Sequence, residues 1–350
     1  MSRAKTLDGA YKSIIIIAIV TAVLILAGTI VMPILFSGMV AILILPLAEF
    51  FEKAKIPRGL AAFLSVIIVS IFLLGLLFAM LIQSQEILKN VPELVQQKTW
   101  EINFDHHSFN SETIYSFLEE HAEAIEENLE ALREGFISTI KQGLIGLKDT
   151  LLFIILVPIY VFFMLLCRTN VYNFVNAYTK KKSENSDTEI IKEVKGSLYQ
   201  YLKGLSLIMT ISGVLTFLGL YIIGIPYALF LGVLTAILTP IPYIGVFISA
   251  TIPVTLALLT KDSWWVAAGV ILVFSIVQFL EAYVFTPRIM GQSVNINPLI
   301  IVIGLIVFGS ITGILGMILT VPLLAITNVI INYYPHLKPW KYLFEDHRVS

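Results

Sequence analysis

The sequence predicts an all-α, polytopic integral membrane protein with about eight transmembrane helices, two of them broken, and a helical insertion outside the cytoplasm. Three observations predict this class. Of the 350 residues, 57% are hydrophobic and 13% are charged, whereas soluble domains carry about 25% charged residues. The mean hydropathy is +0.89. Apolar stretches long enough to cross about 30 Å of hydrocarbon also recur along the chain.

The first apolar stretch, SIIIIAIVTAVLILAGTIVM, follows three basic residues near the N-terminus. No small-residue cleavage site follows it, so we interpret it as a retained span and not as a signal peptide. The stretch PILFSGMVAILILPLA begins at once, with the turn expected near Met32 and Pro33. Further spans are expected at residues 59–82, 149–167, 205–224, 227–260, 264–286 and 297–331, with 227–260 and 297–331 interrupted.

Basic residues in the short loops predict the orientation. With eight spans, the Lys and Arg clusters at residues 3–12, 53–58, 168–182 and 338–348 fall on one side, which we take as cytoplasmic, with both termini on it. The net charge of −1 provides no footprint for nucleic acid. The expected organisation is residues 1–82 for spans 1–3, 83–147 for an acidic extracytoplasmic helical region, 148–168 for span 4, 169–203 for a cytoplasmic linker and interfacial helix, 204–335 for spans 5–8, and 336–350 for a cytoplasmic tail.

The acidic region is expected to hold a short helix from near Pro92 and a long amphipathic helix capped by Ser111. The apolar stripe of the long helix must bury against the membrane or another subunit, and its acidic face favours protein contact and a homo-oligomer. The alternative is a solvated hairpin that serves as a scaffold. His106, His107 and His121 show no metal-ligand spacing.

On the cytoplasmic side, the segment EIIKEVKGSLYQYLKGL has the pattern of an interfacial helix, with Tyr199 and Tyr201 at the headgroups. Cys167 is the single cysteine, which excludes an intramolecular disulfide.

The segment TPIPYIGVFISATIP, residues 239–253, breaks an apolar stretch with three prolines and a glycine. Unpaired backbone groups in hydrocarbon cost several kcal/mol each, so such a break persists only where protein or a water-filled cavity covers it. A break of this kind exposes carbonyls and helix ends that can bind a polar solute at mid-membrane depth. The residues expected to form this part of the site are Thr239, Pro240, Pro242, Tyr243 and Gly245. The alternative is a re-entrant hairpin that only packs.

A second interruption, GSITGILGMILTVPLLA, covers residues 309–325. Gly309, Gly313 and Gly316 are three or four residues apart, which predicts one helix face and close helix packing, and Pro322 is expected to kink the exit. We expect the binding site to lie between the two interrupted stretches.

Between these stretches lie the most polar residues of the apolar C-terminal half. Gln278 and Glu281 share a helix face, and a carboxylate after so many apolar residues is expected to face the protein interior and mark a solute or proton path. Arg288, seven residues on, is a candidate partner for Glu281. The alternative is an ion pair at the membrane surface that locks the helix end.

The motifs GIPYALFLGVLTAILTPIPYIG, PRIMGQSV and GILGMILTVPLLA resemble the C-terminal hallmarks of the autoinducer-2 exporter family of bacterial membrane proteins. The resemblance implies an oligomeric inner-membrane permease with eight spans. Some members are linked to autoinducer-2 export and others to sodium/proton exchange. The residues that match the family pattern are Pro242, Tyr243, Gly245, Gln278, Glu281, Pro287, Arg288, Gly291, Pro298, Gly313, Gly316 and Pro322. The chain departs from many relatives at Leu205, where they have Gln, and at Asn297, where they have His.

Neither a phosphate-binding P-loop motif nor a nucleophile with its base occurs, so we expect a gradient-driven permease and not an enzyme, with no cofactor and no metal site. For a small polar solute, Thr239, Tyr243, Gln278 and Asn295 supply hydrogen-bond partners, with Asn297 nearby. One alternative is a sodium/proton antiporter that uses Glu281 as its coupling carboxylate. Another is an oligomeric membrane scaffold without transport.

Overall fold

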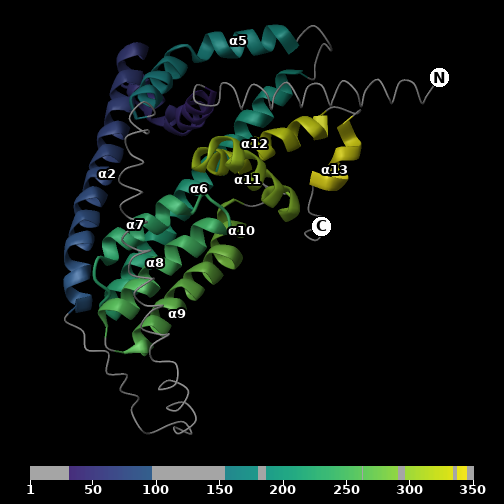
Figure 1. Ribbon diagram of the computed structural model, residues 1–350. Helices are drawn as coiled ribbons and strands as arrows, with labels where there is room; N and C mark the ends of the chain where they lie inside the picture. Colours follow the sequence, from purple (N-terminus) through teal and green to yellow (C-terminus); the bar gives the residue numbers. More distant parts are fainter. Residues whose placement is uncertain are drawn as a thin grey trace. The chain divides into compact units, whose positions relative to one another are not determined.

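The described chain is built from helices. The computed structural model describes residues 31–96, 154–179, 187–261, 263–290, 296–333 and 337–344, which Figure 1 shows as helices joined by turns. The chain divides into two compact units. The first comprises residues 1–71, 152–205 and 290–350, and the second comprises residues 72–151 and 206–289. The long helices α2 (Arg58–Gln96) and α6 (Asp187–Ile223) each contribute to both units.

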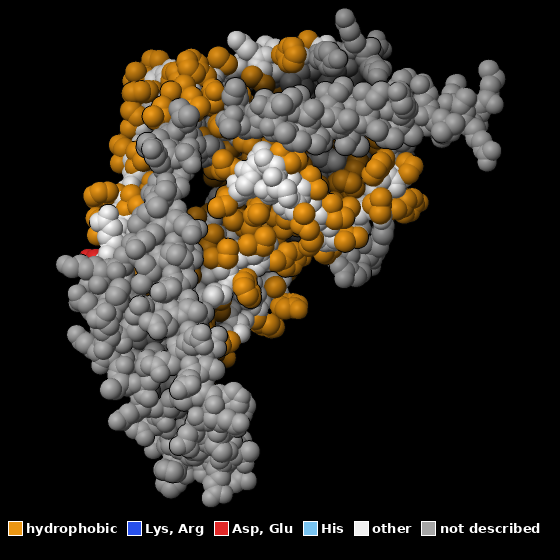
Figure 2. Space-filling view, in the orientation of Figure 1, with side chains coloured by type: hydrophobic (Ala, Val, Ile, Leu, Met, Phe, Trp, Pro, Cys, Tyr) orange, Lys and Arg blue, Asp and Glu red, His pale blue; other side chains and the backbone are white. Residues whose placement is uncertain are grey.

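Five described helices are long and apolar enough to cross a membrane, namely Val31–Lys53, Arg58–Ile87, Glu193–Ile223, Trp264–Ile289 and Ile314–Tyr333. The count becomes six if the helices Ile154–Leu166 and Arg168–Phe174, which meet at 68°, form one bent span. On the face drawn in Figure 2, hydrophobic side chains cover most of the described surface, as expected for helices that face lipid. The prediction of an all-helical polytopic membrane protein is confirmed.

The two interrupted stretches each form two separate helices. The expected first span lies almost entirely outside the described residues, so the count of eight spans stays a prediction. Residues 227–260 form α7 (Ala228–Leu238) and α8 (Ile244–Thr260). Residues 297–331 fall in α11 (Pro298–Thr312) and α12 (Ile314–Tyr333). In each pair the two helices pack against each other. Each stretch is therefore a helical hairpin, an arrangement that a glycine- and proline-rich break permits as readily as a kinked crossing.

Two expected boundaries are wrong, and a third stays a prediction. Met32 and Pro33 lie in the first turn of the helix Val31–Lys53, and the residues before Val31 are outside the described part of the chain, so the turn expected near them is not tested. Pro92 lies inside α2 and does not begin a separate helix. The interfacial helix and the fifth span are one continuous helix, α6, and Tyr201 is only 4% exposed. The physical reason is that a helix already formed gains one hydrogen bond for each added residue, so it continues until the chain stops it.

Buried apolar clusters hold the first unit together. Met32 of the helix Val31–Lys53 packs with Leu198 of α6 and Leu319 of α12. The same first helix packs through Ala48 against the start of α2 and the helix Ile154–Leu166. The short C-terminal helix α13 (Lys338–Phe344) closes this unit beside α11 and α12.

The hairpin of α11 and α12 explains the glycines of the second interruption. Gly313 has a φ of 67° and ends α11, so the three glycines do not share one helix face as expected. Gly309 lies against Met317, and a Cβ on Gly316 would overlap the carbonyl oxygen of Phe308. The expected close approach is present, but it joins two antiparallel helices. Pro322 is buried inside α12.

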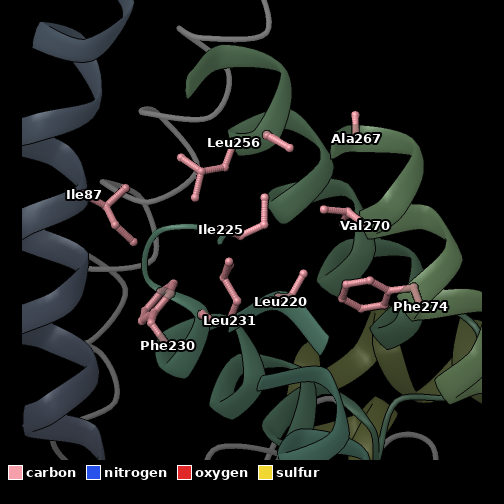
Figure 3. Packing of buried hydrophobic residues seen from close by; sticks show 11 residues of the cluster. Ile87, Leu220, Ile225, Phe230, Leu231, Leu256, Ala267, Val270 and Phe274 are labelled. Atoms are coloured by element: carbon pink, nitrogen blue, oxygen red, sulfur yellow. The ribbon is translucent and has the colours of Figure 1, made fainter. Parts of the chain in front are cut away.

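The second unit packs around one apolar cluster. Leu220 of α6, Leu231 of α7, Leu256 of α8 and Val270 of α9 (Trp264–Leu280) are each 0% exposed. Figure 3 shows these side chains converging, with Ile87 of α2 reaching the cluster from the side. This core fixes α6, α7, α8 and α9 against one another and so determines where the polar groups of these helices lie.

A glycine turn ends α6 and begins the hairpin of α7 and α8. Gly224 has a φ of 77°, its N–H donates to the carbonyl of Tyr221, and the N–H of Ile225 donates to the carbonyl of Leu220. These two bonds form a Schellman motif, which needs a residue with positive φ. Ile225 and Leu220 also share the apolar core, so packing reinforces the end of the helix.

Candidate functional site

Helices α6 and α9 run antiparallel in close contact. A Cβ added to Gly219 of α6 would press against Val273 of α9, and one added to Gly269 of α9 would meet Ile223 of α6. In these two contacts the residue numbers rise along α6 as they fall along α9, so the helices are antiparallel. The contacts also define which residues of α6 and α9 lie at the same level. Small residues at these points let the two backbones approach, as is common in membrane helix pairs.

This register brings a serine to the intramembrane carboxylate. The hydroxyl of Ser212 on α6 donates a hydrogen bond of 2.7 Å to Oε2 of Glu281. Ser212 is 0% exposed and Glu281 is half-buried. A polar group inside an apolar helix pair is costly unless it is hydrogen-bonded, so this pair is the most conspicuous polar feature of the second unit.

One turn along α6, Thr216 is also 0% exposed, and its hydroxyl has no hydrogen-bond partner among the described residues. Other buried or half-buried threonines of this unit, such as Thr235 and Thr239, donate to the carbonyl four residues earlier. The contacts of α6 with α9 place Thr216 about level with Ile276 and Val277. Ser212 and Thr216 therefore present two hydroxyls that are not used by the backbone of their own helix.

Glu281 begins a π-helical turn, η1 (Glu281–Phe285), which is followed by α10 (Thr286–Ile289). The N–H of Thr286 donates to the carbonyl of Glu281, five residues earlier. Pro287 lacks a backbone N–H and its ring crowds the preceding turn, and the wider π turn accommodates it. Single π turns are frequent at functional sites. This π turn was not predicted from the sequence, in which Pro287 was its signal.

Arg288 does not pair with Glu281 in the described structure. Arg288 is exposed at the end of α10, and the hydrogen bond found for the Glu281 carboxylate is the one from Ser212. In the described structure the Glu281 carboxylate therefore has a neutral hydroxyl, and not a cation, as its partner.

The break between α7 and α8 turns the chain back on itself. Tyr243 has φ 64° and ψ −56°, and the N–H of Ile244 donates to the carbonyl of Pro242 at 2.7 Å. This is a γ-turn with positive φ, a rare and strained conformation. A Cβ on Gly245 would overlap the carbonyl oxygen of Leu238, so only glycine closes the hairpin.

The hairpin starts and ends at the same end of α6. Gly232 and Ala236 of α7 lie against Phe217 and Gly213 of α6, in antiparallel order. Lys261, which follows α8, approaches Gly224 at the end of α6. The tip of the hairpin and the π turn therefore lie at similar levels along α6, on the two helices that pack against it.

The remaining predicted site residues are distributed as follows. Pro240 is buried, Thr239 and Pro242 are half-buried, and Tyr243 is 58% exposed. Gln278 is half-buried one turn before Glu281. Gly291 and Asn295 lie outside the described residues, as do the predicted helix from Ser111 and the three histidines of the acidic region. The two interruptions belong to different units, so we build the candidate site within the second unit.

Asn297 has a structural use in the first unit. Its Oδ1 accepts a hydrogen bond of 3.0 Å from the N–H of Leu299, which makes it the N-cap of α11, and Pro298 occupies the first helical position. The N–H of Asn297 donates to the carbonyl of Phe344 at 2.7 Å. Because its side-chain oxygen caps the helix, we leave Asn297 out of the candidate site.

Replacing Asn297 with alanine is expected to lower the stability of the folded protein by about 1 kcal/mol, the usual effect of losing an N-cap. Asn297→Asp keeps an oxygen that can accept the N–H of Leu299, so it is expected to retain the wild-type stability. The comparison is made on the thermal unfolding midpoint of the purified full-length protein. Equal midpoints for the alanine and aspartate variants would contradict the capping role.

Ser212 and Thr216 are the site residues that the sequence analysis missed. Their signal is the spacing of SGVLTFLG, residues 212–219, in which two hydroxyls and two glycines recur on one part of a helix. Nothing in that spacing indicates which carboxylate they face. Within the described residues, no three His, Cys, Asp or Glu side chains gather closely enough to hold a metal ion.

The fold and this site define a class: a polytopic helical membrane protein with a hydrogen-bonded carboxylate among its membrane helices. Comparison with known proteins specifies it further. The model of the AI-2E family of transporters matches residues 14–336, and the chain belongs to this family. It is thus a membrane protein of a bacterial transporter family and not an enzyme.

Two relatives from Bacillus subtilis (strain 168) carry names that record an inferred transport role. The chain is 28% identical to YrrI over 87% of each protein, and 31% identical to YueF over 86% of this chain and 83% of YueF. PerM of Escherichia coli (strain K12), named as an inferred permease, is 25% identical over 61% of this chain and 60% of PerM.

Proposed function

We propose that this protein is a gradient-driven permease that exports a small polar solute, and that the solute passes along the polar groups of the second unit. The observation that carries the proposal is the hydrogen bond between Ser212 and Glu281 inside an otherwise apolar pair of membrane helices. A polar pair of this kind is costly in a bilayer, and intramembrane carboxylates generally mark a solute or ion path. Membership of the AI-2E family supports transport as the activity.

In this proposal the solute site combines Ser212, Thr216 and Glu281 with Gln278 and the tip of the hairpin at residues 239–245. The unpartnered hydroxyl of Thr216 and the half-buried amide of Gln278 could hydrogen-bond to a solute that carries hydroxyl or carbonyl groups. Because Thr216 is 0% exposed, the proposal requires the helices around it to separate during transport. The γ-turn at Tyr243 and the π turn at Glu281 are two irregular backbone segments beside this proposed site. We propose that they open and close the path.

Two tryptophans at the start of α9 support a proposal for how deep in the membrane Glu281 lies. Trp264 and Trp265 stack at the start of α9 and are 47% and 67% exposed, which is typical of a membrane–water boundary. α9 has 17 residues, so Glu281 lies about 25 Å along the helix from that boundary. For a hydrocarbon core of about 30 Å, we propose that the carboxylate lies in the part of the membrane farther from these tryptophans.

We further propose that the basic loops mark the cytoplasmic side of the inner membrane, that both chain termini lie there, and that the protein acts as a homo-oligomer. An accessibility assay with a labelled cysteine in the loop of residues 54–57 tests this orientation. Labelling of that loop from the periplasmic side would contradict it.

The function itself is tested in proteoliposomes. Purified protein is assayed for the flux of small neutral polyols, including autoinducer-2, and separately for pH-driven exchange of sodium or potassium. We expect saturable flux of at least one polyol down its gradient. Cation exchange without polyol flux would instead support the alternative, a sodium/proton antiporter. The observation that favours this alternative is the carboxylate of Glu281 among membrane helices. If the folded protein shows neither polyol flux nor cation exchange, the result supports the scaffold alternative.

The variant Thr216→Val separates a transport role from a packing role. Valine has nearly the shape of threonine and removes an unpaired buried hydroxyl, so stability is expected to stay level or rise by up to about 1 kcal/mol. Solute flux is expected to fall several-fold because the solute loses a partner. Thr210→Val is the matched control, since that hydroxyl is exposed and donates to the carbonyl of Ser206. Unchanged flux in Thr216→Val would remove Thr216 from the site.

A further inference from the structure

The helix α5 (Arg168–Thr179) is amphipathic, although the sequence analysis assigned its residues to a linker. The apolar positions 171, 174, 175 and 178 recur at the spacing i, i+3, i+4 and i+7, while Thr169, Asn173 and Asn176 fall on the opposite side. Val171 is 54% exposed and Tyr172 is 41% exposed. The described chain therefore leaves this apolar stripe largely uncovered around Val171.

The position and the direction of α5 follow from the helix Ile154–Leu166, which precedes it, and from the start of α2. It continues from the apolar helix Ile154–Leu166 after a bend of 68°, so if that helix crosses the membrane steeply, α5 runs nearly along the membrane surface. Figure 1 shows α5 crosswise to the first turns of α2. At about 18 Å long, α5 would change depth by only about 7 Å between its two ends.

A polar network ties the start of α5 to two other membrane helices. Nη2 of Arg168 lies 2.6 Å from Oε2 of Glu52, at the end of the helix Val31–Lys53. Arg58, the first residue of α2, donates to Oγ1 of Thr169 at 2.8 Å and to the carbonyl of Leu165 at 3.3 Å. Two membrane helices turn around at this point, through residues 54–57. The network therefore holds the first turn of α5 at the level where the membrane helices end.

From these contacts we propose that α5 is an interfacial helix that binds the bilayer surface, with its apolar stripe among the lipid acyl chains and its asparagine face toward water. Amphipathic helices of this kind bury their apolar face about 5–10 Å below the headgroups, which matches the shallow inclination of α5. Exposed lysines at this end, Lys53 and Lys55, and the run Lys180–Lys182 in the sequence after α5 suit the headgroup layer. The proposal does not depend on which solute the protein carries.

The test uses the full-length protein reconstituted in vesicles of phosphatidylethanolamine and phosphatidylglycerol. Cys167 is the single cysteine, so Cys167→Ser supplies a background for labelling. Val171→Cys and Asn173→Cys are then labelled one at a time with an environment-sensitive fluorophore. Each is quenched separately by a lipid that carries a nitroxide near its headgroup and by aqueous iodide. Both positions are exposed, so the labels are not expected to disturb the fold.

We expect the label at position 171 to be quenched several-fold more by the nitroxide lipid than the label at position 173, and the order to reverse with iodide. Equal access of iodide to both positions would show that α5 stands in water and would overturn the proposal. Protection of position 171 from both quenchers would show that protein covers the stripe, such as a second copy of this chain, and would also overturn it.

Discussion

Replacing Glu281 with leucine is expected to reduce solute flux in proteoliposomes by about one to two orders of magnitude while the protein still folds. A hydrogen bond to a charged group contributes about 1.5–3 kcal/mol, and 1.4 kcal/mol corresponds to a factor of ten. The substitution removes the carboxylate that the proposed solute site uses and leaves the hydroxyl of Ser212 without the acceptor it has in the structure. Flux is measured at equal amounts of reconstituted protein, after size-exclusion chromatography shows the wild-type profile.

Two further variants serve as comparisons for Glu281→Leu. Ser275 also lies on α9, but it is exposed and its hydroxyl donates to the carbonyl of Ile271 in the same helix. Ser275→Ala is therefore expected to change flux little. Ser212→Ala removes the donor to Glu281 and is expected to lower flux, though less than Glu281→Leu because the carboxylate remains. Wild-type flux in Glu281→Leu would contradict the proposed site.

Glu281→Gln distinguishes the two transport mechanisms. Glutamine keeps the shape of glutamate and an oxygen that can accept the hydrogen bond from Ser212, but it does not exchange a proton. A neutral solute is expected to cross at a rate within a few-fold of wild type. If the wild-type protein exchanges cations against protons and the glutamine variant loses both this exchange and all solute flux, the antiporter hypothesis replaces the permease proposal.

Replacing Gly245 with alanine is expected to destabilise the folded protein by about 3 kcal/mol or more and to abolish transport. The added methyl group would overlap the carbonyl oxygen of Leu238, which belongs to the backbone and cannot rotate away. Forced overpacking usually costs about 1–3 kcal/mol, and a backbone clash is at the high end. The tip of the hairpin must then open, which disturbs the strained turn at Tyr243. The measurement is the thermal unfolding midpoint of the purified full-length protein, followed by the flux assay.

Gly196→Ala is the matched control. Gly196 lies in α6, and an added Cβ there meets nothing within 4 Å. Alanine in a helix interior is about 1 kcal/mol more favourable than glycine, so this variant is expected to be as stable as wild type or more stable. A Gly245→Ala variant that matches wild type in midpoint and in flux would show that the closed hairpin is not required.

Much of the class could be predicted from local pattern. The apolar stretches predicted membrane helices at 59–82 and 264–286, and the structure has Arg58–Ile87 and Trp264–Ile289 there, because length and hydropathy alone decide whether a helix suits a bilayer. Glu281 could be singled out for a related reason, since a carboxylate among apolar residues is costly wherever the helix packs. The break near Pro240 was likewise predicted, because proline limits helix formation through its own backbone chemistry, whereas the end of α11 at Gly313 was not.

The amino-acid sequence by itself determined that this chain is a helical membrane protein, that an apolar stretch is interrupted near Pro240, and that Glu281 is an unusual residue. Only the tertiary structure decided that the interrupted stretches fold back as hairpins and that Ser212 and not Arg288 is the partner of Glu281. The physical reason is that a break constrains the chain over a few residues, whereas its direction afterwards depends on packing. The partner of Glu281 likewise depends on the register between α6 and α9, which contacts such as Gly219 with Val273 set.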